Sequence, residues 1–166
     1  MDNIKLIRVD YRLIHGQVIT KWFGQIQGQE IVIIDDTLSN DSFMADIYKM
    51  SAPPSSKVSV YSVEESVLKL KNNSFSKGRT LVLFKTVDQV KKAFKSGFPF
   101  DEIQIGGLGS APGRKTVFGP ITLDDSDAQA LHDINKSGVR VYFHQVPEER
   151  KMELEDILNK NSFNIS

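Results

Sequence analysis

Apolar positions along this chain follow two periods, and their alternation predicts a repeating order of strands and helices. Short apolar runs, too short for a stable helix, are followed by segments in which apolar residues recur at three- and four-residue intervals. The predicted strands cover residues 4–9, 31–34, 58–61, 81–84, 103–105 and 139–143. The predicted helices carry apolar faces within residues 18–26, 43–50, 63–70, 87–94, 124–134 and 154–158.

This order predicts the fold class. Alternating strands and helices favour an α/β protein, a three-layer α/β/α sandwich with a mostly parallel central sheet. The irregular residues 106–123 are the expected place for short strands that would make one edge of the sheet antiparallel. A chain of 166 residues normally forms one domain, and no linker or internal repeat divides this one, so we predict a single domain over residues 1–166.

The second predicted helix has clear end signals. A polar residue among 39–41 can cap its start, and the prolines at 53–54 end it. Phe43, Ile47 and Met50 recur at helical spacing and would form its apolar face, the face that normally packs against a sheet.

Composition narrows the classes of function. The chain has no cysteine, which excludes disulfides and thiolate metal sites. Lys+Arg and Asp+Glu both number 21, so nothing in the charge favours nucleic acid or an anionic membrane surface. The amino terminus lacks the pattern of a secretory signal, and no apolar run approaches the ~18 residues of a membrane span. We therefore expect a cytoplasmic protein that takes part in membrane processes only through a partner.

The loop between the first strand and the first helix carries the strongest candidate chemistry. Asp10, Arg12 and His15 lie within six residues at the carboxyl end of a strand, where α/β proteins usually bind ligands. The arginine offers a planar, permanently charged fork for phosphate, and an imidazole is a nucleophile near neutral pH. This combination suits a phosphoryl carrier. The alternative is a helix-start histidine beside a surface ion pair of Arg12 with Asp10.

Other strand ends offer weaker candidates. Asp35 and Asp36 could hold Mg²⁺, but acids in this position are more often turn and cap residues. Lys85 and Thr86 follow the fourth strand, where a second binding loop would lie.

The remaining histidines give little support to a metal site. His144 ends the last strand and could reach the same edge as His15, yet a zinc site needs three convergent ligands and only these two can be named. His132 falls on a predicted helix beside an apolar position and needs no role.

The glycine-rich segment at 106–116 nearly matches a phosphate-binding loop. It fails on spacing, because three residues rather than four separate Gly109 from Gly113 and Arg114 intrudes before Lys115. It also lacks the third glycine of a dinucleotide fingerprint. A hairpin-like excursion is the favoured interpretation. A nucleotide- or flavin-binding regulatory module that uses residues 106–113 stays open as a second function.

The sequence Arg-Leu-Ile-His-Gly-Gln-Val at 12–18, after an apolar strand ending in Asp10, resembles a known active-site segment. It is similar to that of the enzyme IIB components of the mannose/fructose/sorbose family of the bacterial phosphoenolpyruvate-dependent sugar phosphotransferase system. Segments that resemble this family in the same order lie at 32–36, 51–54, 81–86, 105–109 and 141–147.

The resemblance implies a role for His15, and the physical needs of phosphoryl transfer suggest roles for its neighbours. His15 would take a phosphoryl group on Nδ1 from a phosphohistidine of a IIA partner and pass it to a sugar entering through a membrane IIC/IID complex. This is the activity of a protein-N(pi)-phosphohistidine–sugar phosphotransferase. Arg12 would stabilise the phosphoryl oxygens, and Asp10 would orient Arg12 or the imidazole. The backbone amides expected to bind the phosphate are those of Gly16, Gln17 and Val18.

Neither a cofactor nor a metal is expected for this activity, and the chain itself would not insert into the membrane. The choice among mannose, fructose, sorbose and amino sugars cannot be read from the sequence, because in the family it lies mainly with the membrane subunits. The oligomeric state is equally unreadable.

Overall fold

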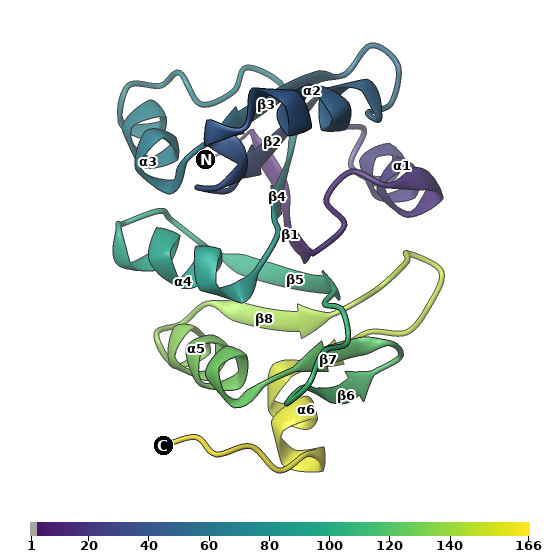
Figure 1. The fold of residues 1–166 in the computed structure, drawn as a ribbon, viewed down its shortest axis with the longest axis vertical. Helices are drawn as coiled ribbons and strands as arrows, with labels where there is room; N and C mark the ends of the chain where they lie inside the picture. The colour runs from purple at the N-terminus through teal and green to yellow at the C-terminus, as the bar shows by residue number, and fades with distance from the viewer. Residues whose placement is uncertain (1–2) are drawn as a thin grey trace.

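A computed structural model describes residues 3–166 and places a seven-stranded sheet at the centre, with strand order β3-β2-β4-β1-β5-β8-β9 (Figure 1). The strands are β1 (Ile4–Asp10), β2 (Glu30–Ile34), β3 (Lys57–Tyr61), β4 (Thr80–Phe84), β5 (Glu102–Gly107), β6 (Lys115–Phe118), β7 (Ile121–Leu123), β8 (Arg140–Phe143) and β9 (Met152–Glu153). The helices are α1 (Gly16–Gln25), α2 (Ser42–Met50), α3 (Val63–Lys71), α4 (Val87–Lys95), α5 (Asp125–Lys136) and α6 (Leu154–Lys160), with a short 3-10 turn η1 (Leu38–Asn40) before α2.

Alternating side chains of the strands build two apolar layers, one on each face of the sheet. In β1, Ile7 and Val9 face the layer made with α3, α4, α5 and α6, whereas Leu6 faces the layer made with α1 and α2. Figure 1 shows α3, α4 and α5 along the left of the sheet and α1 on the right. Every pairing within β3-β2-β4-β1-β5-β8 is parallel. The predicted three-layer sandwich with a mostly parallel sheet is confirmed.

The antiparallel edge exists, but at a different place from the one expected. β9 pairs antiparallel with β8, through Tyr142 with Glu153 and Phe143 with Met152. The short strands within 106–123 instead pair with each other as a separate hairpin, β6 with β7. The reason is that β5, which precedes them, lies between β1 and β8 and leaves no free edge beside it.

The predicted apolar face of α2 is wrong. The helix packs on the sheet through Ala45, which is buried, together with the half-buried Met44 and Tyr48. Phe43, Ile47 and Met50 are exposed to solvent; the exposed fractions of Phe43 and Met50 are 73% and 85%. The helix has apolar residues on two faces, and the face with the small Ala45 can approach the strands more closely. The predicted cap is confirmed, since the Asp41 side chain accepts a hydrogen bond from the Met44 amide.

The helices are short. The longest of those formed by residues 3–166 is α5, with 12 residues, whereas a helix that crosses a bilayer needs about 20. No helix in this range has both the length and the apolar character of a membrane span.

Candidate functional site

The loop after β1 lies at the carboxyl edge of the sheet, between the ends of two neighbouring strands. Val9 pairs with Phe84 of β4, and Asp10 pairs with Gly107 of β5. The chain then leaves the sheet at Tyr11 and enters α1 at Gly16. The predicted strand-to-helix loop over 10–16 is therefore confirmed.

Leu13 fixes the shape of this loop. Its φ is 57°, a left-handed conformation that costs a residue with a side chain roughly 1–2 kcal/mol. Its side chain is fully buried in the apolar layer on the α1 side, which contributes about 1.5–3 kcal/mol and offsets that cost. Its amide also donates to the Asp10 carbonyl at 2.9 Å. A second left-handed residue, Gly16 at φ 39°, starts α1. The loop is thus held by a buried side chain rather than left free in solvent.

Asp10 is the centre of the site. Its carboxylate is fully buried, with Oδ2 at 3.0 Å from His15 Nε2 and 3.2 Å from Arg8 Nη2. Oδ1 accepts hydrogen bonds from the Arg12 amide at 3.1 Å and from Arg12 Nε at 3.3 Å. Asp10 thus contacts both the imidazole and Arg12. The alternative is confirmed in part: His15 is the N-cap residue of α1 and Arg12 pairs with Asp10, but this is not a surface pair, because the Asp10 carboxylate has no exposed area.

The environment of Asp10 keeps it ionised. Burial alone would raise the pKa of Asp10, but the hydrogen bond with His15, the charge of Arg8 and the Arg12 amide outweigh burial and hold this pKa below its ordinary value. The site therefore contains a fixed buried negative charge.

The contact with Asp10 also determines the tautomer of His15. An ionised carboxylate can only accept hydrogen bonds, so the proton of a neutral imidazole lies on Nε2 and the lone pair on Nδ1. Within residues 3–166, Nδ1 has no hydrogen-bond partner, and the His15 side chain is 20% exposed. The free nucleophilic nitrogen is thus the one that faces away from Asp10.

Arg12 uses only part of its guanidinium within the chain. Nε contacts Asp10, and the group lies over the Tyr11 ring with Cζ 5.4 Å from the ring centre. The two terminal nitrogens make no hydrogen bond with residues 3–166, and the side chain is 41% exposed. Two donors of the fork therefore remain available to an anion.

The start of α1 differs from that of the other helices. α2, α3, α4 and α5 each have a side-chain cap, and α6 has acidic residues in its first turn. α1 has neither within the described chain. Its first amides, those of Gly16, Gln17 and Val18, therefore present an uncompensated helix dipole beside His15.

Sequence reasoning missed Arg8, the buried partner of Asp10. Its Nη1 donates to Gln104 Oε1 at 2.5 Å and to the His144 carbonyl at 3.0 Å, and its Nη2 donates to the Gln145 carbonyl at 3.0 Å. Burial lowers the pKa of Arg8, and the charge of Asp10 opposes that shift. A signal was present: Arg8 and Asp10 are two residues apart on a strand and therefore share one face. An arginine inside an apolar strand run needs a partner on that face.

The first glycines of the glycine-rich segment make room for this ion pair. A Cβ at Gly106 would lie 1.9 Å from Arg8 Cζ, and one at Gly107 would lie 2.8 Å from Asp10 Oδ1. These glycines end β5, and residues 115–123 form the hairpin. The interpretation as a hairpin-like excursion is confirmed, and the close approach that the glycines allow is to side chains of the same chain.

The loop from His144 to Lys151 lies over Arg8, whose guanidinium donates to the first two carbonyls of this loop. In Figure 1 the loop extends from the end of β8 toward α1. Trp22 Nε1 donates to the Gln145 carbonyl at 2.8 Å, and the Trp22 ring packs edge-on against His144 with the ring centres 4.9 Å apart. His144 Nε2 lies 2.8 Å from the Glu149 carbonyl. His144 thus helps to shape the loop, and its ring is neither hydrogen-bonded to nor stacked on that of His15.

The other candidates for metal binding have structural roles. Asp35 Oδ2 accepts the Leu38 amide at 2.9 Å, and Asp36 Oδ1 accepts the Val63 amide at 2.9 Å. Their interpretation as turn and cap residues is confirmed. Within residues 3–166 no three His, Cys, Asp or Glu side chains are grouped as metal ligands.

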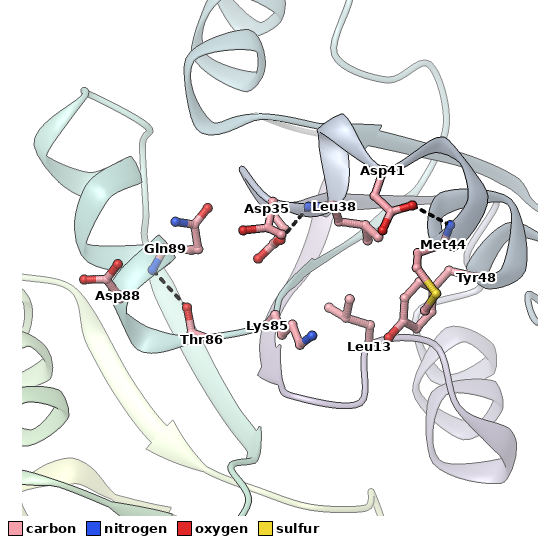
Figure 2. Close-up of a pocket in the computed structure, with 11 residues that line it drawn as sticks. Leu13, Asp35, Leu38, Asp41, Met44, Tyr48, Lys85, Thr86, Asp88 and Gln89 are labelled. Atoms are coloured by element: carbon pink, nitrogen blue, oxygen red, sulfur yellow. Dashed lines mark hydrogen bonds between the residues drawn. The ribbon is translucent and has the colours of Figure 1, made fainter.

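Lys85 and Thr86 line a cavity of about 470 Å³ that is bordered on one side by Leu13 (Figure 2). Thr86 also caps α4, because its hydroxyl accepts the Gln89 amide at 3.2 Å. The other lining residues are Asp35, Thr37, Leu38, Asp41, Met44, Tyr48, Asp88 and Gln89. The two predicted second-loop residues thus lie beside the buried end of the loop, whereas His15 and Arg12 are not part of this cavity.

Comparisons with known proteins agree with this architecture. The family model described as "PTS system sorbose subfamily IIB component" matches residues 4–166. The sorbose-specific EIIB component of Klebsiella pneumoniae is 32% identical over 97% of this chain and 98% of that protein. Two solved structures superpose closely. The structure of manxB from Thermoanaerobacter tengcongensis has a TM-score of 0.88 and 35% sequence identity, with 95% of each chain covered. The structure of the IIBSor domain of the sorbose permease from Klebsiella pneumoniae has a TM-score of 0.89 and 31% identity, with 98% of this chain and 99% of that chain covered. The chain therefore belongs to the sorbose subfamily of IIB components of the sugar phosphotransferase system.

Proposed function

We propose that His15 is the phosphoryl acceptor of this IIB component. The observation that carries the proposal is the 3.0 Å contact between His15 Nε2 and the buried Asp10 carboxylate, which leaves the lone pair of Nδ1 free. A partly exposed nucleophile held by a buried base partner suits transfer between two proteins, since the phosphorus must be approached from outside.

The transfer step follows from the tautomer. The Nδ1 lone pair attacks the phosphorus as the N–P bond of the donor phosphohistidine breaks, and the bonding pair returns to the donor nitrogen. The His15 ring then carries a phosphoryl group on Nδ1 and a proton on Nε2, so it is cationic. The Asp10 carboxylate stabilises that charge at 3.0 Å, and Arg8 keeps Asp10 ionised.

Arg12 and the start of α1 would bind the phosphoryl oxygens. The free terminal nitrogens of Arg12 offer a planar pair of donors, and the uncapped amides of Gly16, Gln17 and Val18 add the positive end of a helix. Phosphoryl transfer needs little more than such positioning and charge stabilisation. Lys85 and Thr86 would contact a partner from the neighbouring strand end rather than bind the phosphoryl oxygens, because they line a cavity that His15 and Arg12 do not share.

The partners follow from this role. The donor would be a phosphohistidine on a IIA protein, and the acceptor a hydroxyl of a sugar bound by a membrane IIC/IID complex. There the hydroxyl oxygen attacks the phosphorus, the N–P bond to His15 breaks, and the hydroxyl proton leaves to a base outside this chain. The protein would then work in the cytoplasm, associated with the permease from its cytoplasmic face.

The test is phosphorylation by phosphoenolpyruvate, the general phosphotransferase proteins and a IIA. The expected product carries one acid-labile, base-stable phosphate on His15, and His15→Gln abolishes it. His132→Gln serves as the matched control and keeps full acceptance. Label on His132 or His144 in mass spectra, or label that persists in His15→Gln, would contradict the assignment. A rise in melting temperature with nucleotide or flavin would instead support the regulatory module.

A further inference from the structure

The outward face of α2 is apolar and exposed to solvent. The exposed fractions of Phe43, Ile47 and Met50 are 73%, 40% and 85%, and their spacing places them on one side of the helix. Within residues 3–166, only Tyr11 and Leu68 are other large hydrophobic side chains with comparable exposure. Grouped exposed apolar side chains, unlike scattered ones, mark interaction sites.

This face is not needed to hold α2 in place. The helix already packs on the sheet through Ala45, Met44 and Tyr48, and its start is capped by Asp41. The apolar side chains on the exposed face are therefore not required to pack α2 within the fold of residues 3–166.

The cavity beside the same helix has an acidic lining. Three of the residues that line it are acidic, Asp35, Asp41 and Asp88, whereas one, Lys85, is basic. Its apolar wall consists of Leu13, Leu38, Met44 and Tyr48, as Figure 2 shows. Such a lining disfavours anions and suits a lysine or arginine, whose aliphatic stem can lie on the wall while its charged end reaches the carboxylates.

The apolar face and the cavity form one surface, because Asp41, Met44 and Tyr48 of α2 line the cavity while Phe43, Ile47 and Met50 project from the same helix. The cavity also reaches the phosphoryl-transfer loop through Leu13, two residues before His15. A partner bound here would be held next to that loop. It should present a basic side chain flanked by apolar ones.

We propose that this surface docks the membrane-embedded sugar complex through a basic cytoplasmic segment of that complex. Cytoplasmic loops of membrane proteins carry an excess of lysine and arginine, which complements the acidic cavity. The inference rests on the proposed function and adds to it the place where the second partner binds. The α1 side of the loop, with Arg12 and Lys21, is then left for the IIA donor. Trp22 adds no surface there, because it is buried and its Nε1 donates to the Gln145 carbonyl.

The test uses inverted membrane vesicles that contain the cognate IIC/IID complex. One variant, Phe43→Ser with Met50→Ser, removes the apolar face. Another, Asp41→Asn with Asp88→Asn, reduces the charge, while the asparagine introduced at position 41 can still cap α2. Leu68→Ser on α3 and Asp156→Asn on α6 are matched controls on exposed positions away from the cavity. Melting curves establish that each variant is folded.

In the α2 and cavity variants, the concentration of phosphorylated protein for half-maximal sugar phosphorylation should rise about ten-fold, as for loss of an interface anchor. Acceptance of phosphate from IIA should stay at the wild-type rate, and the controls should match wild type in both assays. Added salt should weaken binding of the wild type and leave the Asp41→Asn/Asp88→Asn variant less affected.

Unchanged half-maximal concentrations would overturn the inference. Slower acceptance of phosphate from IIA, with an unchanged half-maximal concentration of the phosphorylated protein, would also overturn it, because this surface would then belong to the IIA interface. Cosedimentation of unphosphorylated protein with the vesicles separates this inference from the proposed function. If His15 takes no phosphate, the proposed function fails. If the wild type cosediments no more strongly than the Phe43→Ser/Met50→Ser variant, only the docking surface is contradicted.

Discussion

Replacing Gly106 with alanine should displace Arg8 and thereby shift its partner Asp10, which holds His15. The new methyl group would lie 1.9 Å from Arg8 Cζ, well inside van der Waals contact, and Arg8 is fully buried and cannot swing into solvent. Overpacking of this kind costs about 1–3 kcal/mol, and each hydrogen bond lost by the guanidinium costs a further ~1.5–3 kcal/mol. If one of its bonds to Gln104, His144, Gln145 or Asp10 is lost, the melting temperature should fall by on the order of 10 °C.

Thermal melting with Gly24→Ala as the control measures this effect. Gly24 lies in α1, and a Cβ there would meet nothing within 4 Å, so this variant should gain about 0.5–1 kcal/mol from its better helix propensity. Phosphate acceptance by Gly106→Ala should also fall, on the order of 10²-fold for a displacement of about 1 Å at Asp10 and His15. Gly24→Ala should accept phosphate normally.

A double-mutant cycle shows whether the clash is with Arg8. In an Arg8→Gln background the side chain is shorter, so Gly106→Ala should cost less than it does in the wild type. Two results would refute the idea that the space at Gly106 keeps Arg8, and through it the site, in place. One is an equal loss of stability from Gly106→Ala in both backgrounds, and the other is a Gly106→Ala protein with wild-type stability and phosphate acceptance.

Two further predictions concern Asp10 and Arg12. Asp10→Asn should lose about 3–5 kcal/mol near neutral pH, because it leaves Arg8 buried without a counter-charge. Since the pKa of Asp10 is held below its ordinary value of about 3.9, its stabilising contribution is present above that pH and is lost in more acid solution. Denaturant titrations should therefore show the gap between wild type and Asp10→Asn narrowing in acid, and a constant gap would contradict the pKa assignment. Arg12→Lys should slow transfer from labelled IIA in rapid-quench experiments because it loses the planar fork, and Arg12→Ala should slow it on the order of 10²-fold or more. Near-normal transfer by Arg12→Ala would leave phosphate binding to the α1 amides alone.

The sequence was sufficient to predict the order of the strands and helices along the chain, apart from β9, and the strand-to-helix loop with Asp10, Arg12 and His15. These predictions depend on local signals, namely the spacing of apolar residues and the residue types at the ends of helices and strands. Arg8 was missed because its partners Gln104, His144 and Gln145 are distant in the chain, and only its spacing from Asp10 hinted at them. β9 was missed because two residues carry no periodicity.

The face of α2 was predicted wrongly for a different reason. Phe43, Ile47 and Met50 have helical spacing, but so do Met44 and Tyr48, and period alone cannot rank two apolar faces of one helix. Only the packed structure decides between them. The face that stays in solvent, with Phe43, Ile47 and Met50, is the one that forms the proposed docking surface.

The bonds from Arg8 to the carbonyls of residues 144 and 145 span 136 and 137 positions of the chain. On the ribosome, β1 therefore emerges long before the segment that completes the environment of its arginine. Until residue 145 has been made, Arg8 must stay hydrated, and the first strand cannot settle in the centre of the sheet without burying an incompletely bonded charge. A nascent chain that stops short of this point should expose the loop with Asp10, Arg12 and His15 in an unformed state, so the candidate site can form only after residue 145 has been made.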